Sequence, residues 1–121
     1  MKIESFEDIE SWKEARLLVR DIYGALNECR DYGFRDQIQR AAVSIMSNIA
    51  EGFERGGNKE FIQFLTIARG SLAEVKSLNY AALDVGHFDG NRHTLILERC
   101  DKLGNLINGF IRYLKNSERK R

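Results

Sequence analysis

The stretch "RAAVSIMSNIAEGFERGG", Arg40 to Gly57, decides the fold of this chain. Its apolar residues recur at steps of three and four, which is the period of an amphipathic α-helix. A second series with the same steps is mostly polar and runs beside the first: Gln37, Arg40, Ser44, Ser47, Glu51 and Arg55. Small and polar residues in mid-helix indicate either that two helices approach closely there or that this face touches something other than protein.

The same periodicity continues on both sides of this stretch. It predicts helices over about 8–27, 35–53, 59–85 and 92–116, in one domain spanning residues 1–121 with no proline. Four amphipathic helices joined by short turns predict an all-α, antiparallel up-down-up-down four-helix bundle. The expected core residues are Ile9, Trp12, Ala15, Val19, Ile22, Leu26, Ile38, Ala42, Ile45, Ile49, Phe53, Phe61, Phe64, Leu65, Ala68, Leu72, Val75, Asn79, Ala82, Ile96, Leu103, Leu106, Ile107, Phe110 and Leu114.

Local signals predict where the helices begin and end. Ser5 and Asp8 have the spacing of a capping box, so they are expected to start the first helix. Gly33 is expected in a turn, and Asn58 is expected to cap the third helix. Gly70 lies in mid-helix, where glycine is unfavourable, so we expect a neighbouring backbone to pass close to it.

Several apolar residues lie outside the expected core stripes of the last two helices. A bundle that is apolar on more than one side often buries the surplus between subunits, so the sequence indicates a homo-oligomer. These residues are Ile62, Ile67, Leu78, Leu95 and Ile111.

Motifs for catalysis and metal binding are missing from the sequence. It holds no H-E-x-x-H, P-loop or G-x-S-x-G motif, and its nearest approach to a metal motif is the single pair Asp84 and His87. His93 is expected to be exposed, and Cys29 and Cys100 to be free thiols in a reducing cytoplasm. We therefore expect a non-enzyme without metal or cofactor, and without a signal peptide or membrane span.

The segment Gln39 to Ser71 resembles the central signature of the four-helix-bundle family first met in intervening sequences of bacterial 23S rRNA, also called S23-like. Trp12, Ala15, Ile22 and Tyr23 also fit, so the resemblance covers most of the first three helices. One departure is Met46, where the family usually has proline. The matching core residues are Asn48, Ile49, Ala50, Glu51, Gly52, Arg55, Phe61, Phe64, Leu65, Ala68, Gly70 and Ser71.

The resemblance implies a homopentameric ring with a central channel. It also implies a relation to the accessory variability determinant of diversity-generating retroelements, a relative implicated in binding nucleic acid and a reverse transcriptase. In such a ring, the polar stripe would form a subunit seam or a channel wall, and Glu51 would have Arg55 or Arg40 as its hydrogen-bond donor. The structural motif would comprise Ser44, Asn48, Glu51, Gly52, Gly70 and Ser71.

Two function classes follow. The first is a non-enzymatic accessory protein that binds nucleic acid, with RNA as the expected partner and DNA as the open alternative. Its candidate contacts are Arg40, Arg55, Lys59, Arg69 and Lys76 and the tail residues Lys115, Arg119, Lys120 and Arg121. The second is a protein-protein interaction module without a nucleic-acid role, which the net charge of only +1 favours. In that case the basic side chains would be solvated and paired with Glu51, Glu54, Glu60 and Glu74.

Overall fold

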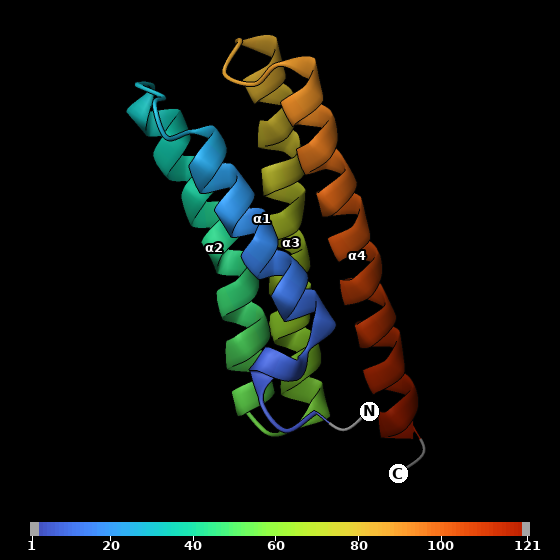
Figure 1. Ribbon diagram of the computed structural model, residues 1–121. Coiled ribbons are helices and arrows are strands. Elements are labelled where there is room, and N and C mark those ends of the chain that lie inside the picture. Colours follow the sequence, from blue (N-terminus) through green and yellow to red (C-terminus); the bar gives the residue numbers. More distant parts are fainter. Residues whose placement is uncertain (1–2, 120–121) are drawn as a thin grey trace.

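The computed structural model describes residues 3–119 of the chain. Its elements are a short 3-10 helix η1 (Phe6–Asp8) and four α-helices, and the described part contains no strand. The α-helices are α1 (Glu10–Ala25), α2 (Tyr32–Glu54), α3 (Asn58–Asp84) and α4 (Gly90–Arg119). In Figure 1 the colours follow the chain up α1, down α2, up α3 and down α4.

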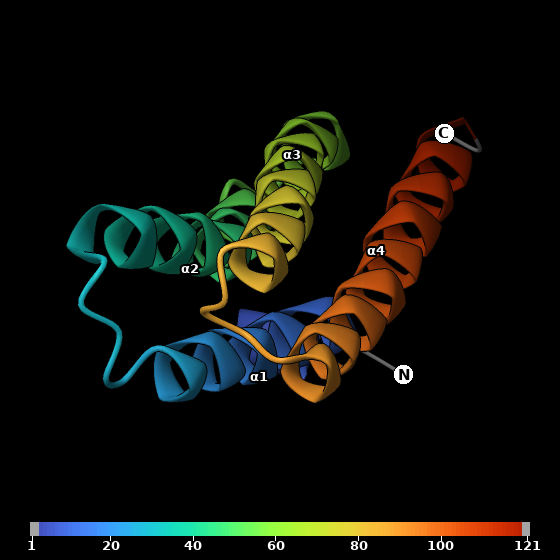
Figure 2. The same cartoon turned by 90° about the horizontal axis from the view of Figure 1, so that it is seen from above.

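The four helices form a closed cycle of neighbours. Helix α1 packs against α2 and α4, and α3 packs against the same two helices, whereas the diagonal pairs make no comparable contact within the described residues. Figure 2 shows this arrangement from above. The α2–α3 face and the α1–α4 face therefore lie on opposite sides of the bundle.

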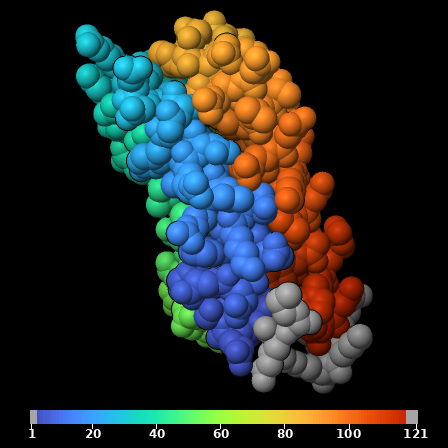
Figure 3. All heavy atoms as spheres, in the orientation of Figure 1, coloured from blue at the N-terminus to red at the C-terminus, as the bar shows by residue number. Residues whose placement is uncertain are grey.

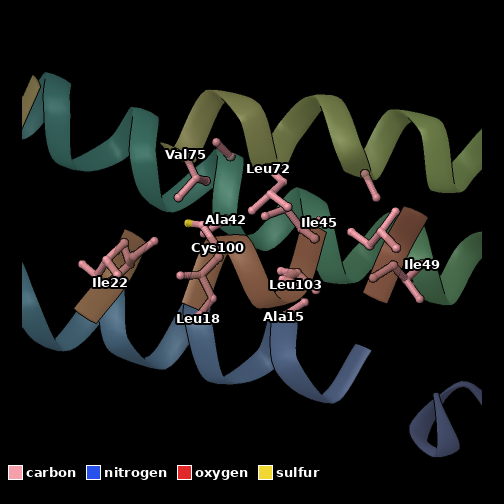
Figure 4. Packing of buried hydrophobic residues seen from close by; sticks show 14 of the residues in the cluster. Ala15, Leu18, Ile22, Ala42, Ile45, Ile49, Leu72, Val75, Cys100 and Leu103 are labelled. Carbon is pink, nitrogen blue, oxygen red and sulfur yellow. The ribbon is translucent and has the colours of Figure 1, made fainter. Parts of the chain in front are cut away.

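The core consists of one apolar stripe from each helix. Figure 4 shows Leu18 and Ile22 of α1 with Ile45 of α2, Val75 of α3 and Leu103 of α4 around the same interior. Burying one large apolar side chain is worth about 1.5–3 kcal/mol, so these stripes hold the helices together. Most of the predicted core is confirmed: the residues exposed by at most 6% include Ile9, Ala15, Ile22, Leu26, Ile38, Ala42, Ile45, Ile49, Phe61, Leu65, Ala68, Leu72, Val75, Asn79, Ala82, Ile96, Leu103, Ile107 and Leu114.

Some core assignments were wrong. Leu18 and Cys100 are buried although they were not among the expected residues, and Ile111, predicted as surplus apolar surface, is only 5% exposed. Of the other surplus residues, Ile67 and Leu95 are exposed. These differences arise because a helix surrounded by two neighbours buries a wider face than one stripe of residues.

Several helix ends differ from the prediction. Asp8 does accept a hydrogen bond from Ser5 N (3.1 Å), but this pair caps η1, and extended backbone at Ile9 separates η1 from α1. Gly33 lies inside the first turn of α2, whose N-cap is Asp31. The N-cap of α3 is Gly57. Asn58 instead donates through Nδ2 to the carbonyl of Leu114 (3.4 Å) and so joins the start of α3 to the end of α4.

Candidate nucleic-acid interface

The polar residues of the opening stretch join α2 to α3 of the same chain. The hydroxyls of Ser44 and Ser71 are 2.9 Å apart. Asn48 Nδ2 donates to the backbone carbonyl of Ser44 (2.8 Å) and to its hydroxyl oxygen (3.0 Å). We call Ser44, Asn48 and Ser71 the α2–α3 seam. Ser44 and Asn48 thus hydrogen-bond within their own chain, as expected for Asn48, and the placement of the polar stripe at a subunit seam or a channel wall stays a prediction.

One end of the seam depends on a glycine. A Cβ placed on Gly52 would lie 2.6 Å from Cβ of Phe64 and 2.9 Å from Cδ1 of Phe61. No side chain fits at such distances, so the side chains of Phe61 and Phe64 on α3 pack directly against the backbone of α2 at Gly52. Gly70 was expected to mark a similar approach, but a Cβ there would meet nothing within 4 Å, so that prediction is wrong.

Arg55 closes the same end of the α2–α3 face. Its guanidinium lies 3.4 Å from a carboxylate oxygen of Glu51 and 5.0 Å from the centre of the Phe64 ring. The predicted donor for Glu51 is therefore confirmed as Arg55. The ion pair is half exposed, so it remains close to solvent.

A groove of about 500 Å³ lies at the other end of the face. Gln37 Nε2 donates to the carboxylate of Glu74 (3.3 Å) across it. Arg40 is exposed and makes no hydrogen bond or ion pair within the described residues, which leaves its guanidinium free. We call this the α2–α3 groove; it is lined by Gln37, Arg40, Ala41, Ser44, Ser71 and Glu74.

The five predicted basic residues do not form one cluster. Arg40, Arg55 and Lys59 belong to α2, its C-terminal cap and the first turn of α3. Arg69 and Lys76 lie instead on the α3–α4 side, because Arg69 donates to Asn108 (3.0 Å) and Lys76 pairs with Asp101 (2.8 Å).

The neighbours of each basic side chain decide whether it is free to contact a phosphate. The hydrogen bond to Asp101 and its charge raise the pKa of Lys76 above its ordinary value. Lys59 is exposed and has no partner within the described residues. In the predicted basic tail, Lys115 is exposed, whereas the side chain of Arg119 and both Lys120 and Arg121 lie outside the described residues.

Sequence reasoning missed the contacts that shape this face. Glu74 was expected as a partner for a basic residue but accepts from Gln37, and Phe64 was expected only in the core but also lies under Arg55. The position of Gln37 in the polar stripe was the one signal for the groove. Its partner on α3 could not be found without the register between the two helices.

His93 and Cys100 are packed inside the bundle. His93 was expected to be exposed but is buried, and its Nδ1 lies 3.2 Å from the carbonyl of Asn79. Burial raises the pKa of the Cys100 thiol to about 12, so this thiol stays protonated. No three His, Cys, Asp or Glu side chains within residues 3–119 are placed to hold a metal ion. In the same range no helix combines the length and apolarity needed to cross a membrane.

These features define a four-helix protein whose second and third helices are joined by a short polar seam. A family model of the 23S rRNA-intervening sequence proteins matches residues 7–109, and the chain belongs to this family. The match spans Met46, which is half-buried within an uninterrupted α2.

A solved structure confirms the fold. It is a crystal structure from Bacteroides thetaiotaomicron, described as a protein with unknown function from the S23 ribosomal protein family. It superposes with a TM-score of 0.78 at 21% sequence identity and covers 84% of this chain and 97% of its own. No curated protein matches the sequence.

Proposed function

We propose that this protein is a non-enzymatic accessory protein that binds RNA through its α2–α3 face. The observation that carries the proposal is the free guanidinium of Arg40 in the α2–α3 groove. Arginine presents a planar fork of donors that matches two phosphate oxygens, and an arginine already paired with a carboxylate would have to give up that partner first. Arg40 has no such partner to lose.

The surroundings of Arg40 suit a phosphate. The nearby hydroxyls of Ser44 and Ser71 are half-buried and can donate to an anion. Glu74 is the nearest acid in the groove, and its carboxylate accepts the amide of Gln37. The groove therefore offers a free cation and neutral donors, and the charge of the one carboxylate beside them, that of Glu74, opposes a phosphate.

A strand of RNA would extend from this groove along α2. Arg40 and Arg55 are separated by fifteen positions, about 22 Å along a helix. Arg55 and Lys59 lie at the far end, where the Arg55 guanidinium also covers the Phe64 ring. Phosphate contacts of this kind position a nucleic acid without reading its sequence.

Three cations on one chain give weak binding, so repetition is part of the proposal. We place the protein in the cytoplasm as a homopentameric ring that presents the α2–α3 face five times, which multiplies weak contacts. Exposed apolar residues such as Ile67, Leu95 and Val85 support the association of chains. The relation to the accessory variability determinant remains a prediction.

A titration of structured RNA and of duplex DNA of the same sequence tests the proposal. We expect RNA to bind more tightly, and its affinity to fall as salt rises from about 50 to 200 mM, because bound phosphates release counterions. Light scattering on the same sample is expected to give five times the monomer mass. An absence of RNA binding even at the lower salt concentration contradicts the proposal.

The second candidate is a protein-protein interaction module with no nucleic-acid role. It is favoured by the partners that three of the five candidate cations already have: Glu51 for Arg55, Asn108 for Arg69 and Asp101 for Lys76. A ring that forms without binding RNA or DNA at any salt concentration would favour this candidate.

A further inference from the structure

A mainly apolar pocket lies on the face opposite the α2–α3 groove. It has a volume of about 420 Å³ and lies between the start of α1 and the second half of α4. Figure 3 shows side chains of these two helices meeting along this side of the molecule. Its apolar lining comes mainly from Ile3, Ile9, Leu106 and Phe110. Pockets that bind small molecules are commonly of this size and character.

Ser11 gives the pocket an unused hydrogen-bonding group. This residue lines the pocket and is only 2% exposed, and its hydroxyl has no partner within the described residues. A buried hydroxyl normally has a hydrogen-bond partner, so this one is an exception that needs an explanation. The hydroxyl oxygen is itself shielded in this structure, so an occupant of the pocket reaches it only after a change of the staggered χ1 rotamer of Ser11.

The start of α1 lies beside the pocket, since Glu10 and Ser11 line it. The N-cap of α1 is Ile9, whose side chain cannot accept a hydrogen bond. The first N–H groups of a helix have no partner within the helix, and together they form its positive end. Ser11 lies in this first turn, so both kinds of donor favour an acceptor atom in the occupant.

The acids at the pocket decide the charge of that occupant. Asp8 and Glu10 line it as well. Asp8 accepts the N–H groups of Glu4 and Ser5, and the first of these hydrogen bonds is 3.0 Å long. Two carboxylates repel an anion, and the apolar lining disfavours any charged group because its desolvation is costly. A neutral molecule avoids both penalties.

From these observations we propose that the pocket binds a small, neutral, mainly apolar molecule through a carbonyl or hydroxyl acceptor that receives a hydrogen bond from Ser11. The apolar body lies against Leu106 and Phe110. The available volume exceeds the apolar cavity of about 150 Å³ that holds benzene. This site is separate from the RNA face, so either can fail without the other.

Three probes that share one ring separate the contributions: acetophenone as a neutral acceptor, ethylbenzene without an acceptor, and benzoate as an anion. Amide NMR shifts of Glu10 to Trp12 and of Phe110 report binding to the full-length protein. We expect acetophenone to bind best and benzoate not to bind. Ser11→Ala should weaken acetophenone binding by about 2- to 10-fold, which is the value of one neutral hydrogen bond, and leave ethylbenzene unchanged.

A pocket-filling variant controls for the location. Gly109 lines the pocket, and a Cβ on it would meet only Arg112 Nη2 at 3.8 Å, so Gly109→Leu should fold and abolish binding of acetophenone. Three results overturn the proposal. In the first, acetophenone leaves these amide shifts unchanged up to its solubility limit. In the second, benzoate binds as well as acetophenone. In the third, acetophenone does not bind and Gly109→Leu changes the mass of the oligomer, which would assign the pocket to a second copy of the chain.

Discussion

Gly52 lies so close to Phe64 that a Cβ on the glycine would be 2.6 Å from the Cβ of the phenylalanine. Gly52→Ala therefore forces α2 and α3 apart, and we expect it to lower the free energy of unfolding by about 1–3 kcal/mol. Denaturation by urea, followed by circular dichroism, measures the change. Gly70→Ala is the matched control, because Gly70 has open space around it and alanine should add up to about 1 kcal/mol there. Equal effects of both variants would contradict this account.

The hydroxyl pair of the α2–α3 seam should behave as a coupled unit. Ser44→Ala and Ser71→Ala each remove the 2.9 Å hydrogen bond, so the double variant should cost less than the sum of the two single variants. The expected coupling energy is about 0.5–1.5 kcal/mol. Urea denaturation of the four proteins in the cycle gives this value. Strictly additive losses would show that the pair contributes nothing to stability.

The ion pairs between α1 and α4 depend on Arg99. Its guanidinium lies 2.6 Å from Asp21 and 3.3 Å from Glu14, whose side chain is only 11% exposed. Arg99→Met leaves Glu14 with Lys102, at 3.2 Å, as its one ion-pair partner among residues 3–119. We expect a loss of about 1–3 kcal/mol in the free energy of unfolding.

A matched control for Arg99 is the exposed pair of Lys13 and Glu10 on α1. Lys13→Met should cost less than about 0.5 kcal/mol, because an exposed pair within one helix adds little. The same thermal or urea denaturation measures both variants. A larger loss in Lys13→Met than in Arg99→Met would contradict the assignment.

The contact between Asp31 and His87 should make the free energy of unfolding depend on pH in the acidic range. His87 Nε2 lies 2.9 Å from Asp31 Oδ2 and joins the loop before α2 to the loop before α4. This hydrogen bond, followed by that from Phe34 N, lowers the pKa of Asp31 below its ordinary 3.8. The folded state thus holds the acid proton less readily than the unfolded state. The stabilisation is complete above the ordinary pKa and is lost as the pH falls through the folded value.

Asp31→Asn should therefore reduce the loss of stability between about pH 5 and pH 2, while its side chain can still cap α2. Unfolding by urea at several pH values measures the slope. Glu98→Gln is the control, since Glu98 is exposed and has no ion pair within the described residues. An unchanged slope in Asp31→Asn would show that the contact does not stabilise the fold.

For RNA binding, we expect different results from the replacement of Arg40 and of Lys76 by alanine, because the two side chains have different neighbours. Arg40→Ala should weaken binding and reduce the slope of affinity against salt by about one phosphate, because its guanidinium is free. Lys76→Ala should leave both quantities unchanged, because its ammonium is held by Asp101 at 2.8 Å. Fluorescence anisotropy with labelled RNA at several salt concentrations measures them. Equal losses in the two variants would move the interface away from the α2–α3 face.

The periodicity of the sequence was enough to predict four helices and most of their buried positions. The periodicity could not predict helix ends and buried positions that depend on contacts with a neighbouring helix. Gly33 suits a turn and Asn58 suits an N-cap. Both nevertheless lie within helices, because Asp31 is the N-cap of α2 and Gly57 is the N-cap of α3. Ile111 was assigned to the surface because its burial depends on two neighbours and not on its own stripe.

The candidate site was predictable only in part. The sequence pointed correctly to Asn48 and Glu51 as hydrogen-bonded residues, whereas Ser44 was expected only as a small residue at a close approach. The stripe alone does not reveal which groups meet across α2 and α3, so the Gln37–Glu74 contact and the stacking of Arg55 on Phe64 were missed. Gly52 and Gly70 look alike in sequence, and only the register of the helices shows that one of them lies in a close approach.

Residues near both ends of the described chain, Ile3 and Leu114, line one pocket together with Phe53. The loop from Asn27 to Arg30, between α1 and α2, lies at the other end of the bundle (Figure 1). Circular permutation is therefore compatible with this topology. A chain that starts at α2, continues through α3 and α4, and returns through a short linker to α1 would keep every helix in contact with its present neighbours.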